Sequence, residues 1–152
     1  MFLTIKYHRS MAVTSDGSDL PQTLLELCCV VDGVRAAASR DIGLTPQQAQ
    51  LLTLVGPREM THSELAGRMY CDKANITGLV DRLERRELVR RQPNPDDRRV
   101  SQVLLTDQGM ELVAHFRHAV QKTIGEHLAS WPATDRRRFA VLARATTEAL
   151  RE

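Results

Sequence analysis

The chain has 152 residues, of which 42% are hydrophobic and 26% are charged, and its formal net charge at pH 7 is +2. This composition is that of a globular protein large enough to bury a core, and it excludes a disordered or fibrous chain. Because the net charge is so small, any binding of nucleic acid must come from local placement of positive charge.

Cysteine usage and hydropathy indicate the compartment. The three cysteines, Cys28, Cys29 and Cys71, form neither a CxxC pair nor an even-numbered framework, which is typical of a reducing cytosol. The first ten residues have too short an apolar run for a signal peptide, and no later stretch could span a bilayer. We therefore expect a cytoplasmic protein with no membrane association. Residues 1–18 are expected to form a flexible arm, and Met11 is a second candidate for the start of translation.

The first half of the chain predicts two helices before the most informative segment. Apolar residues recur at helical spacing from Leu20 to about Ser39, and the four residues 40–43 break the pattern. Thr45-Pro46-Gln47-Gln48 then combines a threonine N-cap, a proline in the first turn and a glutamine at the capping-box position. A second helix is therefore expected to begin there and to end before Gly56-Pro57.

Residues 61–84 predict two short helices joined by a tight turn. Thr61-His62-Ser63-Glu64 is another capping box, and Asp72 can cap the helix that follows. In that following helix, the apolar residues lie at spacing i, i+3, i+4, i+7, which gives one buried face. The residues of this face are Ile76, Leu79, Val80 and Leu83.

The remaining elements are a hairpin and two helices. The turn-rich run QPNPDD separates strands predicted at 88–91 and 100–105. Thr106-Asp107 begins a long helix, which Trp131-Pro132 separates from a last one. The predicted fold is mainly α with a small β-hairpin wing, a winged helix-turn-helix. The long helix is expected to turn Val113, Phe116, Val120, Ile124 and Leu128 inward, and the last helix carries Phe139, Leu142, Ala145 and Ala149.

The helix after Asp72 has an outer face suited to reading DNA. Arginine can bind guanine bidentately, asparagine can bind adenine, and threonine can contact a base edge, a thymine methyl group or a phosphate. Glycine permits close approach, although it weakens the helix. The alternative is a solvated polar face, which most surface helices have. The capped helix before it and the hairpin after it favour DNA. The candidate residues are Lys73, Asn75, Thr77, Gly78 and Arg82.

The hairpin tip carries the second group of candidate DNA-binding residues. Arg98 and Arg99 end a loop with two prolines and two aspartates, and an arginine at such a tip can enter a narrow minor groove. An ion pair with Asp97 would orient the neighbouring guanidinium group. The alternative is a surface turn with incidental charges. Residues 82–99 contain seven arginines and four acidic residues, so the basic excess of the chain concentrates here.

The runs LAGRMYCDKANITGLVDRLERRELVRR at 65–91 and NPDDRRVSQVLLTDQG at 94–109 resemble the MarR family of bacterial transcription regulators. The resemblance extends over about residues 20–150, and its specific part is 65–109. It implies a homodimer that grips a near-palindromic operator in double-stranded DNA. It also implies a single domain at 19–152, with a winged lobe at about 44–105 and dimerisation helices at about 20–40 and 106–151.

The resemblance implies roles for individual residues. Asn75, Thr77 and Arg82 would contact the major groove, Arg99 would enter the minor groove, and Asp97 would hold Arg99. It also implies repression that is relieved by a small ligand, usually aromatic or phenolic, bound between the dimerisation region and the lobe. No cofactor is implied. The few aromatic candidates near such a pocket are Trp131, Phe116 and Phe139.

Redox and metal sensing are alternatives known in branches of the same family. Cys28 and Cys29 lie in the first predicted helix, where adjacent residues point about 100° apart, so one of them is expected to pack into the core or a dimer seam. Cys71 precedes a helix N-terminus, where the helix dipole favours negative charge. The other interpretation of these cysteines is small buried hydrophobic residues. Glu111, His115 and His118 could share a helix face, but no further ligands complete a metal site.

The sequence therefore favours a dimeric DNA-binding repressor. One alternative is a winged helix that binds proteins instead of DNA, and another is a redox-responsive regulator acting through Cys28, Cys29 or Cys71. An enzyme has least support, because no nucleophile and base pair, phosphate loop or complete metal set is present.

Overall fold

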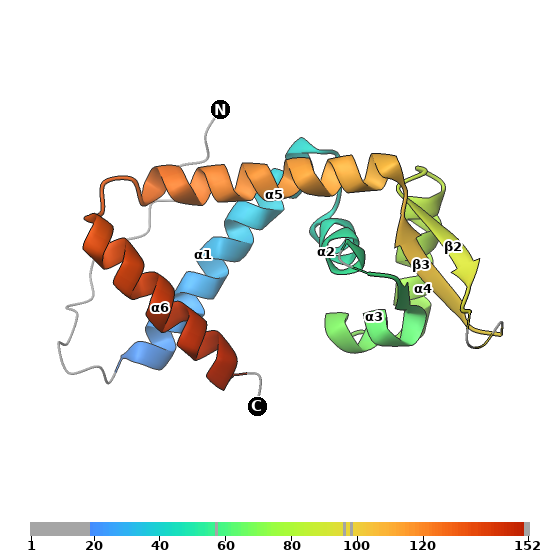
Figure 1. The fold of residues 1–152 in the computed structure, drawn as a ribbon, viewed down its shortest axis with the longest axis horizontal. Coiled ribbons are helices and arrows are strands. Elements are labelled where there is room, and N and C mark those ends of the chain that lie inside the picture. Colours follow the sequence, from blue (N-terminus) through green and yellow to red (C-terminus); the bar gives the residue numbers. More distant parts are fainter. Residues whose placement is uncertain (1–18, 57, 96, 98, 151–152) are drawn as a thin grey trace. The chain divides into compact units, whose positions relative to one another are not determined.

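The computed structural model describes residues 19–150, apart from 57, 96 and 98 (Figure 1). The expected arm at 1–18 and the candidate Arg98 lie outside the described residues. The chain divides into two units, residues 1–33 and 34–152, and the first helix, α1 (Leu20–Asp41), runs from one into the other. This helix ends two residues beyond the predicted boundary.

The described part of the chain is mainly helical with one small antiparallel sheet, as the sequence predicted. None of its helices is both long and apolar enough to cross a membrane. The elements after α1 are α2 (Pro46–Val55), β1 (Met60–Thr61), α3 (His62–Met69), α4 (Lys73–Glu84), β2 (Val89–Pro93), β3 (Ser101–Leu105), α5 (Asp107–His127) and α6 (Ala133–Ala149).

Capping boxes fix the starts of α2 and α3. The Thr45 hydroxyl accepts the backbone N–H of Gln48 at 3.2 Å, and the Gln48 side chain accepts the Thr45 N–H at 2.9 Å. Thr61 and Glu64 repeat the arrangement at 3.2 and 2.8 Å. Each box satisfies two backbone donors that a helix start leaves free, which is why both predicted starts are confirmed.

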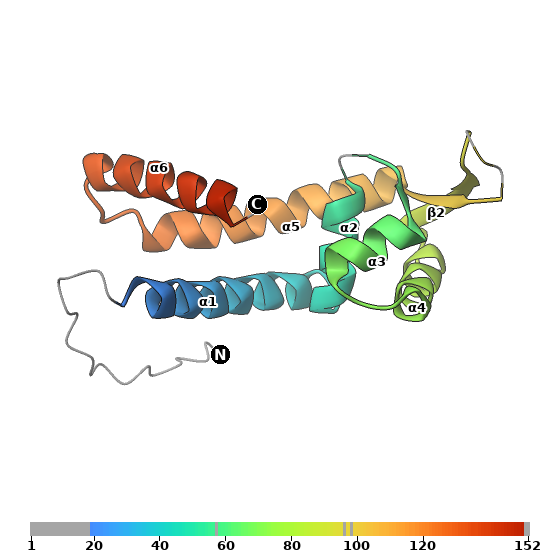
Figure 2. The same ribbon diagram turned by 90° about the horizontal axis from the view of Figure 1, so that it is seen from below.

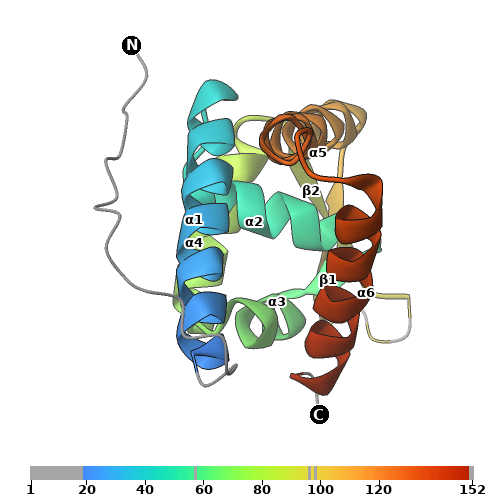
Figure 3. The ribbon, with the colours of Figure 1, turned by 90° about the vertical axis from the view of Figure 1, so that its left-hand side faces the viewer.

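The core of the second unit lies between α2, α3, α4, α5 and the sheet. Leu51 of α2 is fully buried, and the predicted stripe of α4 is buried as well. Figure 3 views α5 nearly along its axis, with α2 crossing near it. The other buried hydrophobic residues include Leu52, Met60, Leu65, Ile76, Leu79, Val80, Leu83, Leu88, Val89, Val103, Val113 and Phe116.

The sheet has the order β1-β3-β2, and its strands are antiparallel. β2 and β3 form the predicted hairpin (Figure 2). In its register, Arg91 lies opposite Val103. The two-residue strand β1 was not predicted, because it is too short to show alternation. It places Met60 against the other side of Val103.

The first turn of α5 packs tightly on the base of the hairpin. The Thr106 hydroxyl caps α5 at Gly109 (3.0 Å) and donates to the carbonyl of Glu87 (2.6 Å). A Cβ on Gly109 would lie 2.0 Å from the carbonyl oxygen of Leu88, so only glycine fits without movement. Val113 and Phe116 are buried as predicted.

The later part of α5 and all of α6 are less buried than the lobe. The other residues predicted to face inward are only partly buried, namely Val120 and Ile124 of α5 and its C-cap Leu128. α6 leaves the end of α5 in another direction (Figures 1 and 3) and has no buried residue. The apolar residues of α6 therefore face outward within this chain.

Candidate nucleic-acid interface

The outer face of α4 carries the predicted residues. Lys73, Asn75, Thr77 and Arg82 are exposed, and Gly78 is half-buried. The buried stripe on the other side of the helix fixes this orientation, because it locks α4 against the core. At the helix start, the Asp72 carboxylate accepts the backbone N–H of Asn75 at 2.7 Å. The structure thus keeps the predicted polar side chains accessible, with Lys73 and Thr77 toward one flank of α4 and Asn75 and Arg82 toward the other.

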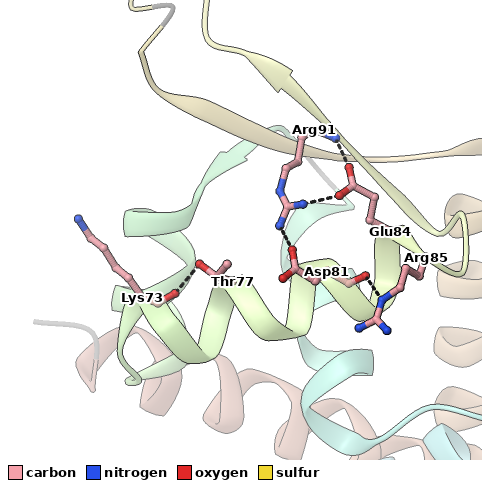
Figure 4. A network of polar contacts seen from close by, with 6 residues as sticks. All are labelled: Lys73, Thr77, Asp81, Glu84, Arg85 and Arg91. Atoms are coloured by element: carbon pink, nitrogen blue, oxygen red, sulfur yellow. Dashed lines mark hydrogen bonds and ion pairs between the residues drawn. The ribbon is translucent and has the colours of Figure 1, made fainter.

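Thr77 and Gly78 show what this surface offers chemically. The exposed Thr77 donates its hydroxyl hydrogen to the carbonyl of Lys73 at 2.9 Å (Figure 4), and its oxygen can still accept a hydrogen bond. An accepting oxygen suits a base amino group, and a methyl group suits a thymine methyl. A Cβ on Gly78 would meet nothing within 4 Å, so internal packing does not require glycine there.

The hairpin tip contains the predicted ion pair. One carboxylate oxygen of Asp97, Oδ1, accepts both the backbone N–H of Arg99 at 3.0 Å and its Nε–H at 3.3 Å. The tip is closed by backbone bonds from Asn94 to Val100 (2.8 Å) and from Val100 to Asp97 (2.9 Å). The Arg99 side chain remains 92% exposed. The Asp97 contact engages the Nε atom, so the tip presents an arginine that is both oriented and accessible.

A second ion-pair network joins the base of the hairpin to α4, and the sequence analysis missed it. The guanidinium group of Arg91, on β2, donates to the carboxylates of Asp81 and Glu84, both on α4 (Figure 4). The Arg91 backbone N–H also donates to Glu84 at 3.3 Å. Asp81 and Glu84 are three residues apart and so share a helix face. Two acidic residues at that spacing, followed by an arginine on the next strand, are the sequence pattern from which this network could have been predicted.

Arg91 also changes the protonation equilibria around it. Its hydrogen bond to Asp81 is the main cause that lowers the pKa of that carboxyl group. The pKa of His62, at the start of α3, is lowered mainly by burial and then by the positive charge of Arg91. The base of the wing is thus electrostatically coupled to the start of α3 and to the second half of α4.

The other candidate sites are not assembled in the described part of the chain. Cys28 and Cys29 are both exposed within this chain, so neither packs into its core, and packing of one of them into a dimer seam stays a prediction. Cys71 is partly buried and packs against the core. A redox role for Cys28 or Cys71 stays a prediction. Within the described residues, no group of three or more His, Cys, Asp or Glu could hold a metal ion.

The three aromatic residues considered for a ligand pocket occupy different places. Phe116 belongs to the core of the lobe. Trp131 and Phe139 contact each other edge to face, with ring centroids 5.8 Å apart, where α5 gives way to α6. The described residues therefore do not bring these three rings to one pocket.

A short helix, a second helix with an outward polar face, and a hairpin with an oriented arginine at its tip define a winged helix-turn-helix protein. The model of the MarR family matches residues 44–101, which span α2 to the start of β3. The chain is 32% identical over 123 residues to the HTH-type transcriptional regulator YcgE of Bacillus subtilis, covering 75% of this chain and 78% of YcgE. The chain belongs to the MarR family of transcriptional regulators.

Two further likenesses extend this result. The HTH-type transcriptional regulator YdgJ of Bacillus subtilis is 34% identical over 104 residues, which cover 67% of this chain and 63% of YdgJ. The crystal structure of CouR from Rhodococcus jostii RHA1 with p-coumaroyl-CoA superposes with a TM-score of 0.69 at 26% identity, covering 90% of this chain and 95% of CouR. The chain thus spans less than two thirds of the length of YdgJ but nearly all of CouR.

Proposed function

We propose that this regulator binds a specific double-stranded DNA operator, with α4 in the major groove and the hairpin tip in the minor groove. The oriented, exposed Arg99 is the observation that carries this proposal, because an arginine held in this way suits the negative potential of a narrow minor groove. On α4, Asn75, Thr77 and Arg82 would read base edges.

The proposed assembly is a homodimer on a pseudo-palindromic site in the cytoplasm. Its half-sites would lie about one helical turn, roughly 10 bp, apart. The exposed apolar residues of α6 support dimerisation, since they lack cover within the chain. These residues are Phe139, Val141 and Leu142, and the C-cap Leu150 is exposed as well.

Repression with release by a small ligand is the proposed mode of regulation. CouR, similar in fold to this chain, was crystallised with p-coumaroyl-CoA. Binding of such a ligand would lower DNA affinity by favouring a conformation in which the two lobes no longer match the half-site spacing. We expect an aromatic or phenolic ligand, as the family resemblance implies.

Selection of bound duplexes from a random library, followed by fluorescence anisotropy, tests DNA reading. We expect enrichment of a palindromic sequence and affinity that falls steeply with salt, because bound arginines release phosphate counterions. Arg99→Ala should weaken operator binding about tenfold or more. Lys122→Ala removes one positive charge from α5, outside the proposed interface, and is the matched control.

The proposal would be overturned if no sequence were enriched and if Arg99→Ala and Lys122→Ala had equal affinity for DNA. The winged-helix protein-interaction module would then be the better hypothesis.

Gly78→Ala gives a second test in which stability and binding move in opposite directions. The free protein has room for the methyl group, and alanine is favoured over glycine in a helix by about 1 kcal/mol. We therefore expect a higher unfolding temperature but weaker operator binding, since the added Cβ would stand between α4 and the bases. A variant that is more stable and binds equally well would show that this part of α4 does not approach DNA closely.

A further inference from the structure

We propose that Arg91 is a positioning residue for DNA recognition: it fixes the wing relative to the recognition helix and thereby sets sequence discrimination. This inference rests on the proposed DNA binding and adds a residue that does not itself touch DNA.

The geometry around Arg91 is that of a clamp between two elements. Its Nη1 atom donates to Glu84 and its Nη2 atom donates to Asp81, so the two ends of one planar group hold two carboxylates. Its backbone N–H adds a third bond to Glu84. A planar guanidinium that is held at both ends resists rotation, and it therefore restrains both translation and twist of β2 on α4.

Burial separates Arg91 from the arginines that are available to DNA. The Arg91 side chain is 28% exposed, whereas that of Arg99 is 92% exposed. Its neighbour Arg90 is exposed on the other face of the same strand. With both Nη atoms already committed to carboxylates, Arg91 is poorly placed to bind a phosphate.

The position of the clamp explains why it would affect specificity. Asp81 and Glu84 lie in the second half of α4, and the first half carries Asn75 and Thr77. β2 continues from Arg91 toward the tip with Arg99. Reading two grooves at once requires a fixed spacing between these side chains. Non-specific phosphate contacts tolerate a variable spacing, because they carry no sequence information.

Arg91 also neutralises two acids beside the DNA-facing surface, and this electrostatic effect must be separated from positioning. Arg91→Met removes both effects. The triple variant Arg91→Met, Asp81→Asn, Glu84→Gln removes the clamp but leaves no unpaired carboxylates. Arg90→Met removes an equal charge from the same strand without touching the clamp.

The experiment measures affinity for a duplex selected by the wild-type protein and for a mixed-sequence duplex, each across a salt series. Circular dichroism confirms that every variant is folded. If the wild-type protein selects no duplex, the proposed function itself fails. If it does, the ratio of the two affinities reports discrimination, and the slope of affinity against salt reports phosphate contacts.

We expect Arg91→Met to lower the ratio of the two affinities about tenfold, within the range of coupling between residues of one network. The triple variant should regain affinity for mixed-sequence DNA without regaining the ratio. Arg90→Met should keep the ratio. Full recovery of the ratio in the triple variant, or an equal loss in Arg90→Met, would overturn the inference. So would a ratio in Arg91→Met that matches the wild-type protein.

Discussion

The lobe from α2 to β3 and the C-terminal helix α6 are built from the same kinds of residues but are stabilised differently. The lobe closes its own core, with Leu51 fully buried, whereas no residue of α6 is buried and Leu142 is 66% exposed. The helices α2 to α5 begin with side-chain caps, but Pro132, at the N-cap position of α6, provides none. The lobe is therefore held by a core that it shares with the first half of α5, whereas the apolar residues of α6 have no such core among the described residues.

The largest expected effect is a loss of stability from a cavity in the lobe. Leu51→Ala should lower the free energy of unfolding by about 2–5 kcal/mol, because the removed methyl groups leave a cavity in a close-packed core. Leu142→Ala, the same substitution on α6, should cost less than about 1 kcal/mol in dilute, monomeric protein. Urea unfolding measures both values. Similar losses for the two variants would contradict the contrast between the regions.

The second effect is steric and lies at the joint between the lobe and α5. Gly109→Ala should destabilise the protein by about 1–3 kcal/mol, since its Cβ would press on the carbonyl of Leu88. Gly125→Ala, on the same helix, meets nothing within 4 Å and should raise stability by up to about 1 kcal/mol. Thermal unfolding of the pair gives changes of opposite sign, and a loss in both variants would count against close packing as the cause.

The third effect concerns dimerisation through the exposed apolar face of α6. If its apolar face binds a second copy, Leu142→Glu should raise the dimer dissociation constant about tenfold or more, because a charge is then buried in the interface. Sedimentation equilibrium measures this constant. Helical content of the lobe should stay the same. An unchanged constant would move the dimer interface away from Leu142.

The smallest effect is a pH dependence inside the lobe. The pKa of His62 is lowered from its ordinary value of 6.5 by burial and by Arg91, so the unfolded chain takes up this proton first as the pH falls. The contribution of His62 to stability is therefore constant above pH 6.5 and decreases as the pH drops from there toward the lowered pKa.

Urea unfolding at several pH values checks this dependence. His62→Gln should show a smaller loss of stability between pH 7.5 and about pH 5.5 than the wild-type protein. In Arg91→Met, an NMR titration should give a higher pKa for His62, because the repelling charge is gone. If the free energy of unfolding changed equally with pH in His62→Gln and in the wild-type protein, His62 would not be the group responsible.

Local chemistry made much of this structure predictable from the sequence. The capping boxes at Thr45 and Thr61 need only neighbouring residues, and so does the ion pair between Asp97 and Arg99, which the structure contains as expected. The buried stripe of α4 follows from its spacing, and removing that stripe identifies the outward face.

Long-range pairing was harder to predict. The bonds of Arg91 depend on how β2 lies on α4, and the strand at Met60 exists only because β3 reaches it. The absence of buried residues on α6 could not be read from its apolar pattern, because that pattern shows that a face needs cover but not which molecule covers it.

The contact between Gly109 and Leu88 has a mechanical consequence. Thr106 bonds to the carbonyls of Glu87 and Leu88, so the first turn of α5 is fixed tightly to the base of the wing. α5 has 21 residues and extends about 30 Å from this joint. A tilt of the α5 axis by about 5° at this joint would displace the far end of the helix by about 3 Å. α5 thus connects the base of the wing directly to the segment that leads into α6.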